Sequence, residues 1–309
     1  MTVISANLVK DLREKTGAGM MDCKKALVEA KGDFETAVDL LRKRGLSQAA
    51  KKAGRIAAEG LVAAFTSGKK GAVLELNSET DFVSKNDKFQ ALASNLVKDF
   101  FNSNKDFSHF ADSTYSASGK KVNEVITDHI AVIGENLSLR RADALQVDSG
   151  AVVSYIHNQV APNLGKIAVL VALESSAPED KLQTLGKQLA MHIAATRPES
   201  LSITDLDQTL VQKERDILSD QARSSGKPDA VIAKMVEGRL SKFYEQVVFL
   251  EQLFVMDGKT KISQVVEDAA KAAGAPITVK GFIRFALGEG IEKVETDFAA
   301  EVAAAAQGA

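Results

Sequence analysis

The chain of 309 residues is long enough to bury a substantial core and to form two or three modules. Its formal net charge is −2, with 45% apolar and 26% charged residues, so the composition is that of a globular protein and excludes nucleic-acid or membrane binding driven by overall charge. The single cysteine, Cys23, excludes an intrachain disulfide, and no signal-peptide pattern or apolar run of about 18 residues occurs, which predicts a protein of the cytoplasm.

The first 55 residues are predicted to form a unit of three helices, because apolar residues recur there at helical spacing in three segments that glycines separate. The third helix is expected to begin after Asp33 as its N-cap and to end at Gly45. Residues 48–55 are then expected to be a basic, weakly packed connector. The apolar positions are Leu8, Val9 and Leu12 in the first segment, Cys23, Ala26, Leu27 and Ala30 in the second, and Phe34, Ala37, Val38 and Leu41 in the third.

Two features of this N-terminal unit could contact a partner. Met20 and Met21 follow the glycine-rich turn 17–19, and flexible apolar side chains on a short loop suit an adaptable protein contact, although at least one of them is expected to pack into the core. The basic residues between Arg42 and Arg55 could hold RNA phosphates. A solvated helix face is the more common explanation of such a run, and both alternatives stay open at this point.

The middle of the chain contains an internal duplication of a hairpin, a polar turn and a helix. We therefore expect two related α+β subdomains with antiparallel sheets, side by side. In each copy an alternating strand precedes a more apolar one, and a helical segment follows. The two strands and the start of the helix fall at 61–66, 71–76 and Lys88 in the first copy and at 152–156, 167–172 and Lys181 in the second.

The remaining segments complete the expected order of elements. A Ser/Asn-rich stretch, 102–120, is expected to be a flexible loop. Helical spacing on both sides of a break at 224–228 predicts an antiparallel helical hairpin over 197–243. Alternation at 281–287 predicts a further strand in one of the sheets. The chain is expected to end in a helix that carries Ile291, Val294, Phe298 and Val302 on one face.

The sequence contains no recognisable catalytic motif. A phosphate-binding loop of the form Gly-x-x-x-x-Gly-Lys-Ser/Thr is absent, and the segment 288–293 has the wrong spacing and places glutamates where phosphates would be repelled. No nucleophilic serine elbow or Cys/His pair is present, and the four histidines are scattered without metal-ligand spacing. His157 ends an alternating strand and is expected at the surface. We therefore expect neither an enzyme nor a cofactor or metal site.

Five stretches, in the same order along nearly the whole chain, resemble bacterial elongation factor Ts. They are long enough that a chance match is negligible. They read LVKDLREKTGAGMMDCKKAL at 8–27, TDFV at 80–83, IGEN at 133–136, MVEGR at 235–239 and GEGIEKVETDF at 288–298.

The resemblance implies a guanine-nucleotide exchange factor for elongation factor Tu, the GTPase that delivers aminoacyl-tRNA to the ribosome. It implies no membrane and no specific nucleic acid among the partners, and it leaves open a homodimer through the hairpin. The implied layout is an N-terminal domain like the ubiquitin-associated domain at 1–55, core subdomains at 56–145 and at 146–196 with 241–287, an inserted helical hairpin at 197–240 and a C-terminal helical module at 288–309.

The resemblance also implies which residues meet elongation factor Tu. Thr80, Asp81, Phe82 and Val83 would form a turn whose aspartate and phenylalanine enter beside the magnesium site of the GTPase. From the residues alone, Phe82 is either folded back into the core or exposed for a contact, because its neighbours are almost all polar. The other implied contacts are Lys10, Arg13, Met20, Met21 and Lys24 in the N-terminal domain, Ile133 and Gly134, which would support the turn, His157 in the second subdomain, and Glu292, Glu295 and Phe298 in the C-terminal module.

Two alternatives to an exchange factor remain. An RNA-binding adaptor would depend on the basic residues between Arg42 and Arg55, and it predicts RNA binding that weakens steeply with salt. A binding module that acts through the N-terminal helices alone would leave the TDFV stretch unexplained.

Overall fold

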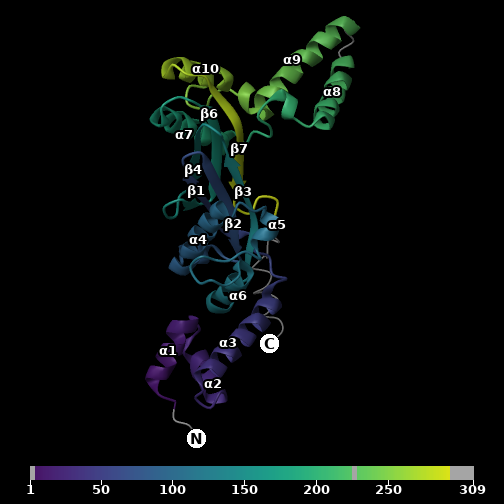
Figure 1. The fold of residues 1–309 in the computed structure, drawn as a ribbon. Helices are drawn as coiled ribbons and strands as arrows, with labels where there is room; N and C mark the ends of the chain where they lie inside the picture. Colours follow the sequence, from purple (N-terminus) through teal and green to yellow (C-terminus); the bar gives the residue numbers. More distant parts are fainter. Residues whose placement is uncertain (1–3, 225–227, 293–309) are drawn as a thin grey trace.

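The computed structural model describes residues 4–224 and 228–292 of the chain. It is an elongated molecule with three helices at one end, two antiparallel sheets and their helices in the middle, and a helical hairpin at the other end (Figure 1). The predicted α+β class with antiparallel sheets is confirmed. None of the helices in the described part of the chain combines the length and the apolar character that a membrane-spanning helix requires.

The N-terminal unit consists of α1 (Ala6–Thr16), α2 (Met20–Glu29) and α3 (Phe34–Lys52). Helix α1 begins where the Ser5 side chain accepts a hydrogen bond from the Leu8 N–H group at 3.2 Å. It ends at Gly17, whose φ of +70° belongs to the left-handed backbone conformation, which glycine adopts at little cost in free energy. The three helices pack around buried side chains that include Leu12, Cys23 and Leu27, as the helical spacing predicts.

Helix α3 does not end at Gly45 as predicted. Gly45 is buried inside the helix, where a Cβ atom would lie 3.2 Å from the Ala131 Cβ of α6 (Val122–Ile133). The glycine therefore allows α3 and α6 to pack closely and does not terminate the helix. The prediction of a weakly packed connector over 48–55 was also wrong, since its first half is helical and Ala49 packs against the core of the first sheet.

The middle of the molecule contains the predicted duplication, which extends further than the sequence indicated. In both copies a second helix leads into a third strand, and that strand pairs with the second strand of the hairpin through one register shift. The first copy comprises β1 (Glu59–Ser67), β2 (Lys70–Ser78), the 3₁₀ helix η1 (Asp81–Lys85), α4 (Asp87–Ser103), α5 (Phe107–Phe110), α6 and β3 (Leu137–Gln146). The second comprises β4 (Gly150–His157), β5 (Leu164–Gly165), β6 (Ile167–Ser175), α7 (Glu179–Thr196), α10 (Ile262–Ala273) and β7 (Ile277–Ala286).

The strands form two antiparallel sheets with the orders β3-β2-β1-β5 and β4-β6-β7. Helix α4 covers the outer face of the first sheet with Phe89 and Leu96, and α7 covers the outer face of the second. The inner faces pack on each other through residues such as Val62, Val73 and Leu170. Because side chains alternate along a strand, one strand can place some side chains in the core between its sheet and the covering helix and others in the core between the two sheets. The predicted strand at the end of the chain is confirmed as β7, which pairs with β6.

The stretch 102–120 is not the flexible loop that was predicted. It contains the end of α4 and the helix α5, and the Phe110 ring is fully buried in the core of the first sheet. Tyr115 is buried as well, and its hydroxyl group accepts a hydrogen bond from Asn95 Nδ2 at 3.0 Å. Asn102, Ser103 and Ser108 lie in these helices, and Ser116 and Ser118 lie in a turn after Tyr115. A composition typical of turns does not reveal such helices or tertiary contacts.

The predicted helical hairpin consists of α8 (Gln208–Arg223) and α9 (Asp229–Val247), which project from the second sheet (Figure 1). It has its own apolar core, which includes Leu218, Val236 and Leu240. Two 3₁₀ helices, η2 (Ile203–Asp205) and η3 (Phe249–Glu251), lie at its base. Ser200 and Val248 form a parallel β-bridge there, so the chain enters and leaves the hairpin at adjacent points. Of the predicted final helix, Ile291 is described and is not helical, whereas Val294, Phe298 and Val302 lie outside the described residues.

Candidate functional site

Phe82 lies on the surface, shortly after the end of β2. It is 76% exposed, whereas the next residue, Val83, is only 6% exposed and packs into the core of the first sheet. A 3₁₀ helix has three residues per turn, so consecutive side chains of η1 point in different directions. Asp81, on the other side of Phe82, is exposed as well. The alternative in which the Phe82 ring folds back into the core is therefore wrong.

The backbone before Phe82 is hydrogen-bonded to the carboxylate of Glu135, which lies in the turn after α6. The Thr80 N–H group donates to Glu135 Oε2 at 2.9 Å, and Thr80 Oγ1 donates to Glu135 Oε1 at 2.6 Å. Thr80 is the N-cap of η1, a position where a threonine side chain often accepts a bond from the helix, but it makes no such bond here. Hydrogen bonds to an ionised acceptor are short and strong, so both Thr80 donors are firmly held.

The backbone after Phe82 is held from the inside. Ser84 is buried, and its Oγ atom donates to the Asp81 carbonyl oxygen at 2.6 Å. Gln90 Nε2 donates to the Ser84 carbonyl oxygen at 2.9 Å, and the Asn86 side chain caps the start of α4. The exposed ring is therefore carried by a segment that is fixed on both sides.

Ile133 and Gly134 lie at the end of α6, next to the residue that holds Thr80. Ile133 is half-buried against the core of the first sheet. Gly134 ends the helix in a left-handed conformation, with a φ of +88°, and its N–H group donates to the Ile130 carbonyl oxygen at 3.0 Å. The structure thereby brings the IGEN and TDFV stretches into one site, with Glu135 as the direct link.

A second set of contacts fixes the turn between α6 and β3. Glu79 Oε1 accepts a hydrogen bond from the Asn136 N–H group at 2.6 Å, and Asn136 Nδ2 donates to the Arg55 carbonyl oxygen at 2.8 Å. The Arg55 guanidinium lies 3.4 Å from the Glu79 carboxylate. Sequence reasoning did not single out any of these residues, nor Glu135, as part of the site. The signal that could have found Glu135 and Asn136 is their position directly after the glycine that ends α6.

Met20 and Met21 are both exposed, at 58% and 62%. They lie in the first turn of α2 and not on a loop. The expectation that at least one of them packs into the three-helix core was wrong, because Cys23, Ala26 and Leu27 occupy the buried face of α2.

The other N-terminal residues of the expected site are also at the surface. Lys10 and Arg13 on α1 and Lys24 on α2 are exposed. A hollow of about 460 Å³ beside α2 is lined by Lys24, Met21 and Val28 among others, and Val28 is itself exposed. Exposed apolar side chains with cations beside them suit an adaptable protein contact.

The remaining expected site residues lie elsewhere. His157 is exposed at the end of β4, with its Nδ1 atom 3.1 Å from the Tyr155 hydroxyl oxygen. Glu292 is exposed as the last residue of the described chain, and Glu295 and Phe298 lie outside the described residues. The expected residues therefore do not form one cluster, because α1 and α2 lie at one end of the molecule and β4 in its middle (Figure 1).

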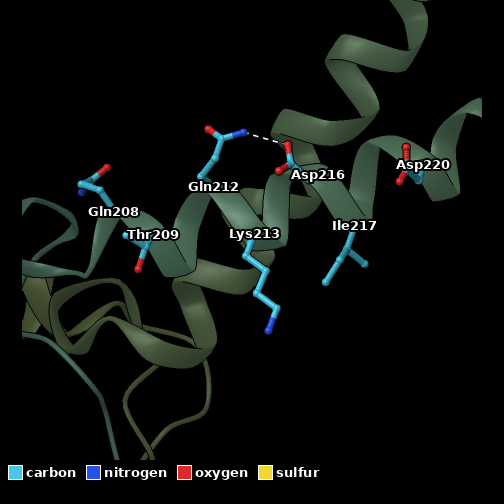
Figure 2. Close-up of a pocket in the computed structure, with 7 residues that line it drawn as sticks. All are labelled: Gln208, Thr209, Gln212, Lys213, Asp216, Ile217 and Asp220. Atoms are coloured by element: carbon cyan, nitrogen blue, oxygen red, sulfur yellow. Dashed lines mark hydrogen bonds between the residues drawn. The ribbon is translucent and has the colours of Figure 1, made fainter.

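A hollow of about 600 Å³ lies on the hairpin, on one face of α8. Figure 2 shows its polar side chains projecting from this single helix, with one hydrogen bond among them, from Gln212 to Asp216 at 2.8 Å. Ile217 is the one large apolar side chain in this view. Over residues 4–224 and 228–292, no group of three or more His, Cys, Asp or Glu side chains is placed to hold a metal ion.

Comparisons with known proteins agree with the motifs. The family model described as "Elongation factor TS" matches residues 79–289. The chain is 56% identical over 306 residues to the elongation factor Ts of Rhodospirillum centenum, across 99% of this chain and 100% of the relative. It is 57% identical over 306 residues to that of Zymomonas mobilis, across 99% of both chains, and 54% identical over 308 residues to that of Parvibaculum lavamentivorans, across 100% of both. The chain belongs to the elongation factor Ts family of translation elongation factors.

Proposed function

We propose that this protein is a guanine-nucleotide exchange factor for elongation factor Tu, without catalytic chemistry of its own, that acts in the cytoplasm. It would bind the GDP-bound GTPase, disturb the magnesium and phosphate site, and promote GDP release so that GTP can bind. The observation that carries this proposal is Phe82, a large apolar ring that is 76% exposed on a segment fixed on both sides. Such a ring is presented for insertion into a partner and contributes little to its own fold.

The proposed action follows from linkage between two bound molecules. A GTPase holds GDP through backbone N–H groups and a magnesium ion that bridges the phosphates. A protein that binds the nucleotide-free GTPase more tightly than the GDP-bound form must weaken GDP binding by the same factor. The Phe82 ring and the Asp81 carboxylate, entering beside the ion, would displace groups that hold it.

The Phe82 ring alone cannot supply enough free energy for this action. Burying a phenylalanine side chain stabilises a complex by about 1.5–3 kcal/mol. A shift of about 10⁴ in an equilibrium requires roughly 5.5 kcal/mol. Further contacts must contribute, and we assign them to Thr80 and, by the family resemblance, to a second group of residues. That group is Lys10, Arg13, Met20, Met21, Lys24, Ile133, Gly134, His157, Glu292, Glu295 and Phe298. Val83, which is only 6% exposed, would support the turn from the core and not by direct contact.

The domain division implied by the resemblance remains part of the proposal. The N-terminal unit, 1–55, would contact the GTPase domain of elongation factor Tu, and the second core subdomain would contact another of its domains. The hairpin would serve assembly of two copies and not the exchange step itself.

The RNA-binding alternative is weakened by the ion pairs of the basic residues. Arg42 lies 3.0 Å from Glu124, Arg44 pairs with Glu29, and Arg55 lies 3.4 Å from Glu79. A guanidinium that already has a carboxylate partner is less available to a phosphate, so half of the basic run is partly neutralised.

The proposal is tested by stopped-flow release of a fluorescent GDP from elongation factor Tu. The wild-type protein should accelerate release strongly, and Phe82→Ala should accelerate it far less. Asp81→Ala should show a smaller loss, because water can in part replace a carboxylate near the ion. Release that does not depend on the added protein would refute the function, and so would a Phe82→Ala variant with the wild-type rate.

A further inference from the structure

The Phe82 ring has few contacts of its own, so its position depends on the backbone around it. On the C-terminal side, Val83 and Ser84 are buried and fix the segment to the core. On the N-terminal side, the two donors of Thr80, one from the backbone and one from the side chain, are both bonded to Glu135. These two bonds join points 55 residues apart in the chain.

A glutamate is well suited to this contact. Each of its two carboxylate oxygens accepts one bond from the same threonine, at 2.9 Å from the backbone nitrogen and at 2.6 Å from the hydroxyl oxygen. Two bonds between the same pair of residues restrict rotation in a way that one bond cannot. A glutamine has only one acceptor oxygen and presents a donor in place of the other, so it can accept only one of the two bonds well.

We propose that Glu135 is a positioning residue for the exchange reaction and holds the Phe82 ring in a fixed position and orientation before the partner binds. This inference rests on the proposed function. A segment that is already ordered avoids the cost of ordering on binding. Where a group must act at one place, a displacement of about 1 Å can lower a rate by about 100-fold. Glu135 does not touch the GTPase in this mechanism and acts only through Thr80 and Phe82.

The experiment compares Glu135→Ala, Glu135→Gln, Phe82→Ala and the double variant Phe82→Ala/Glu135→Ala. The measurement is fluorescent GDP release from elongation factor Tu across a range of exchange-factor concentrations, so that the maximal rate and the half-saturating concentration are obtained separately. We expect Glu135→Ala to lower the maximal rate about tenfold, because both bonds are lost. Glu135→Gln should lower it about threefold, because its amide nitrogen can only donate to the hydroxyl group and the bonds lose the charge of the carboxylate. The double variant should be no slower than Phe82→Ala alone.

Asp205 offers a matched control. Its Oδ2 atom accepts bonds from the Ser202 N–H group at 3.1 Å and from Ser202 Oγ at 2.6 Å, the same pair of donors that Glu135 bonds on Thr80. This contact lies at η2, near the base of the hairpin. Asp205→Ala should lower the melting temperature without changing the rate of GDP release. A loss of rate in Asp205→Ala equal to that in Glu135→Ala would show that stability alone is responsible and would overturn the proposal.

The other outcomes separate this inference from the function on which it rests. If Phe82→Ala releases GDP at the wild-type rate, the proposed function is wrong and the inference is wrong with it. If Phe82→Ala is slow and Glu135→Ala is not, only the inference is wrong. A double variant slower than Phe82→Ala by the full factor of Glu135→Ala also overturns it. Should Glu135→Ala fail to fold, Glu135→Gln decides the test, and a maximal rate equal to that of the wild type would overturn the inference.

Discussion

Replacement of Phe82 by alanine should separate the activity of this protein from its stability. Burying a whole phenylalanine side chain stabilises a fold by about 1.5–3 kcal/mol. Phe82 is 76% exposed, so the quarter that is buried contributes only about 0.4–0.7 kcal/mol to the free energy of unfolding. The truncation leaves no internal cavity, because the ring lies at the surface.

Phe89 provides the matched comparison on the neighbouring helix α4. Its ring is fully buried in the core of the first sheet. Phe89→Ala removes the transfer free energy and leaves a cavity, which should cost about 3–5 kcal/mol. At about 2–4 °C per kcal/mol, Phe82→Ala should melt within about 3 °C of the wild type and Phe89→Ala should melt about 6–20 °C lower.

The assay combines a thermal melt of each free variant, followed by circular dichroism, with stopped-flow GDP release from elongation factor Tu at a temperature where all variants are folded. We expect Phe82→Ala to be stable and slow in exchange, and Phe89→Ala to be unstable but faster than Phe82→Ala. The reasoning is refuted if Phe82→Ala melts as low as Phe89→Ala, because the ring would then be part of the core.

Three further predictions concern other parts of the molecule. Removal of residues 1–54 should weaken binding to elongation factor Tu more than it lowers the maximal release rate, because contacts outside the exchange site mainly slow dissociation. A large loss of the GDP release rate at a saturating concentration of the truncated protein would contradict this. Replacement of residues 203–245 by a short linker should leave a folded core that still releases GDP, because Ser200 and Val248 already pair at the base of the hairpin; a variant with native circular dichroism and no release would argue against it. Burial lowers the pKa of His192 below its ordinary value near 6.5, and the hydrogen bond to Gln252 opposes this only in part. The unfolded chain therefore binds more protons than the folded chain. The free energy of unfolding should fall as the pH drops from about 7 through 6.5 toward the lower pKa of the folded state. Urea titrations between about pH 7.5 and 5.5 should detect the fall, His192→Gln should reduce it, and a flat profile in the wild type would disprove it.

Local patterns in the sequence were sufficient for most of the helices and strands. Helical spacing placed Leu12 and Leu27 in the N-terminal core, and alternation placed β7 in a sheet, because the period of each element is set by its own backbone geometry. The duplication was visible for the same reason, since both copies repeat one order of strands and helix. The polar neighbours of Phe82, together with the family motif, favoured the exposed ring that the structure contains.

Predictions failed where a residue serves a partner that is distant in sequence. Gly45 is a residue typical of helix ends but lies inside α3, where the absence of a side chain favours close packing on α6. Residues 102–120 have the composition of a loop but are held by the buried rings of Phe110 and Tyr115. Composition and periodicity describe a segment by itself and carry no information about the surface against which it packs.

Tertiary structure alone decided the polar contacts. Glu75 on β2 is fully buried and accepts bonds from Arg140, Arg141 and the Gly288 N–H group, the last of which is 213 residues away. Burial alone would raise the pKa of this carboxyl group, but the bonds from Gly288, Asn77 and Arg141 outweigh it and lower the pKa. A buried carboxylate is stable only when such donors converge on it. Arg140 and Arg141 come from the neighbouring strand β3 of the same sheet, and Gly288 follows β7 of the second sheet. The same holds for Thr80 and Glu135: the sequence shows both residues, but only the tertiary structure brings the turn after α6 to hydrogen-bonding distance of the segment after β2.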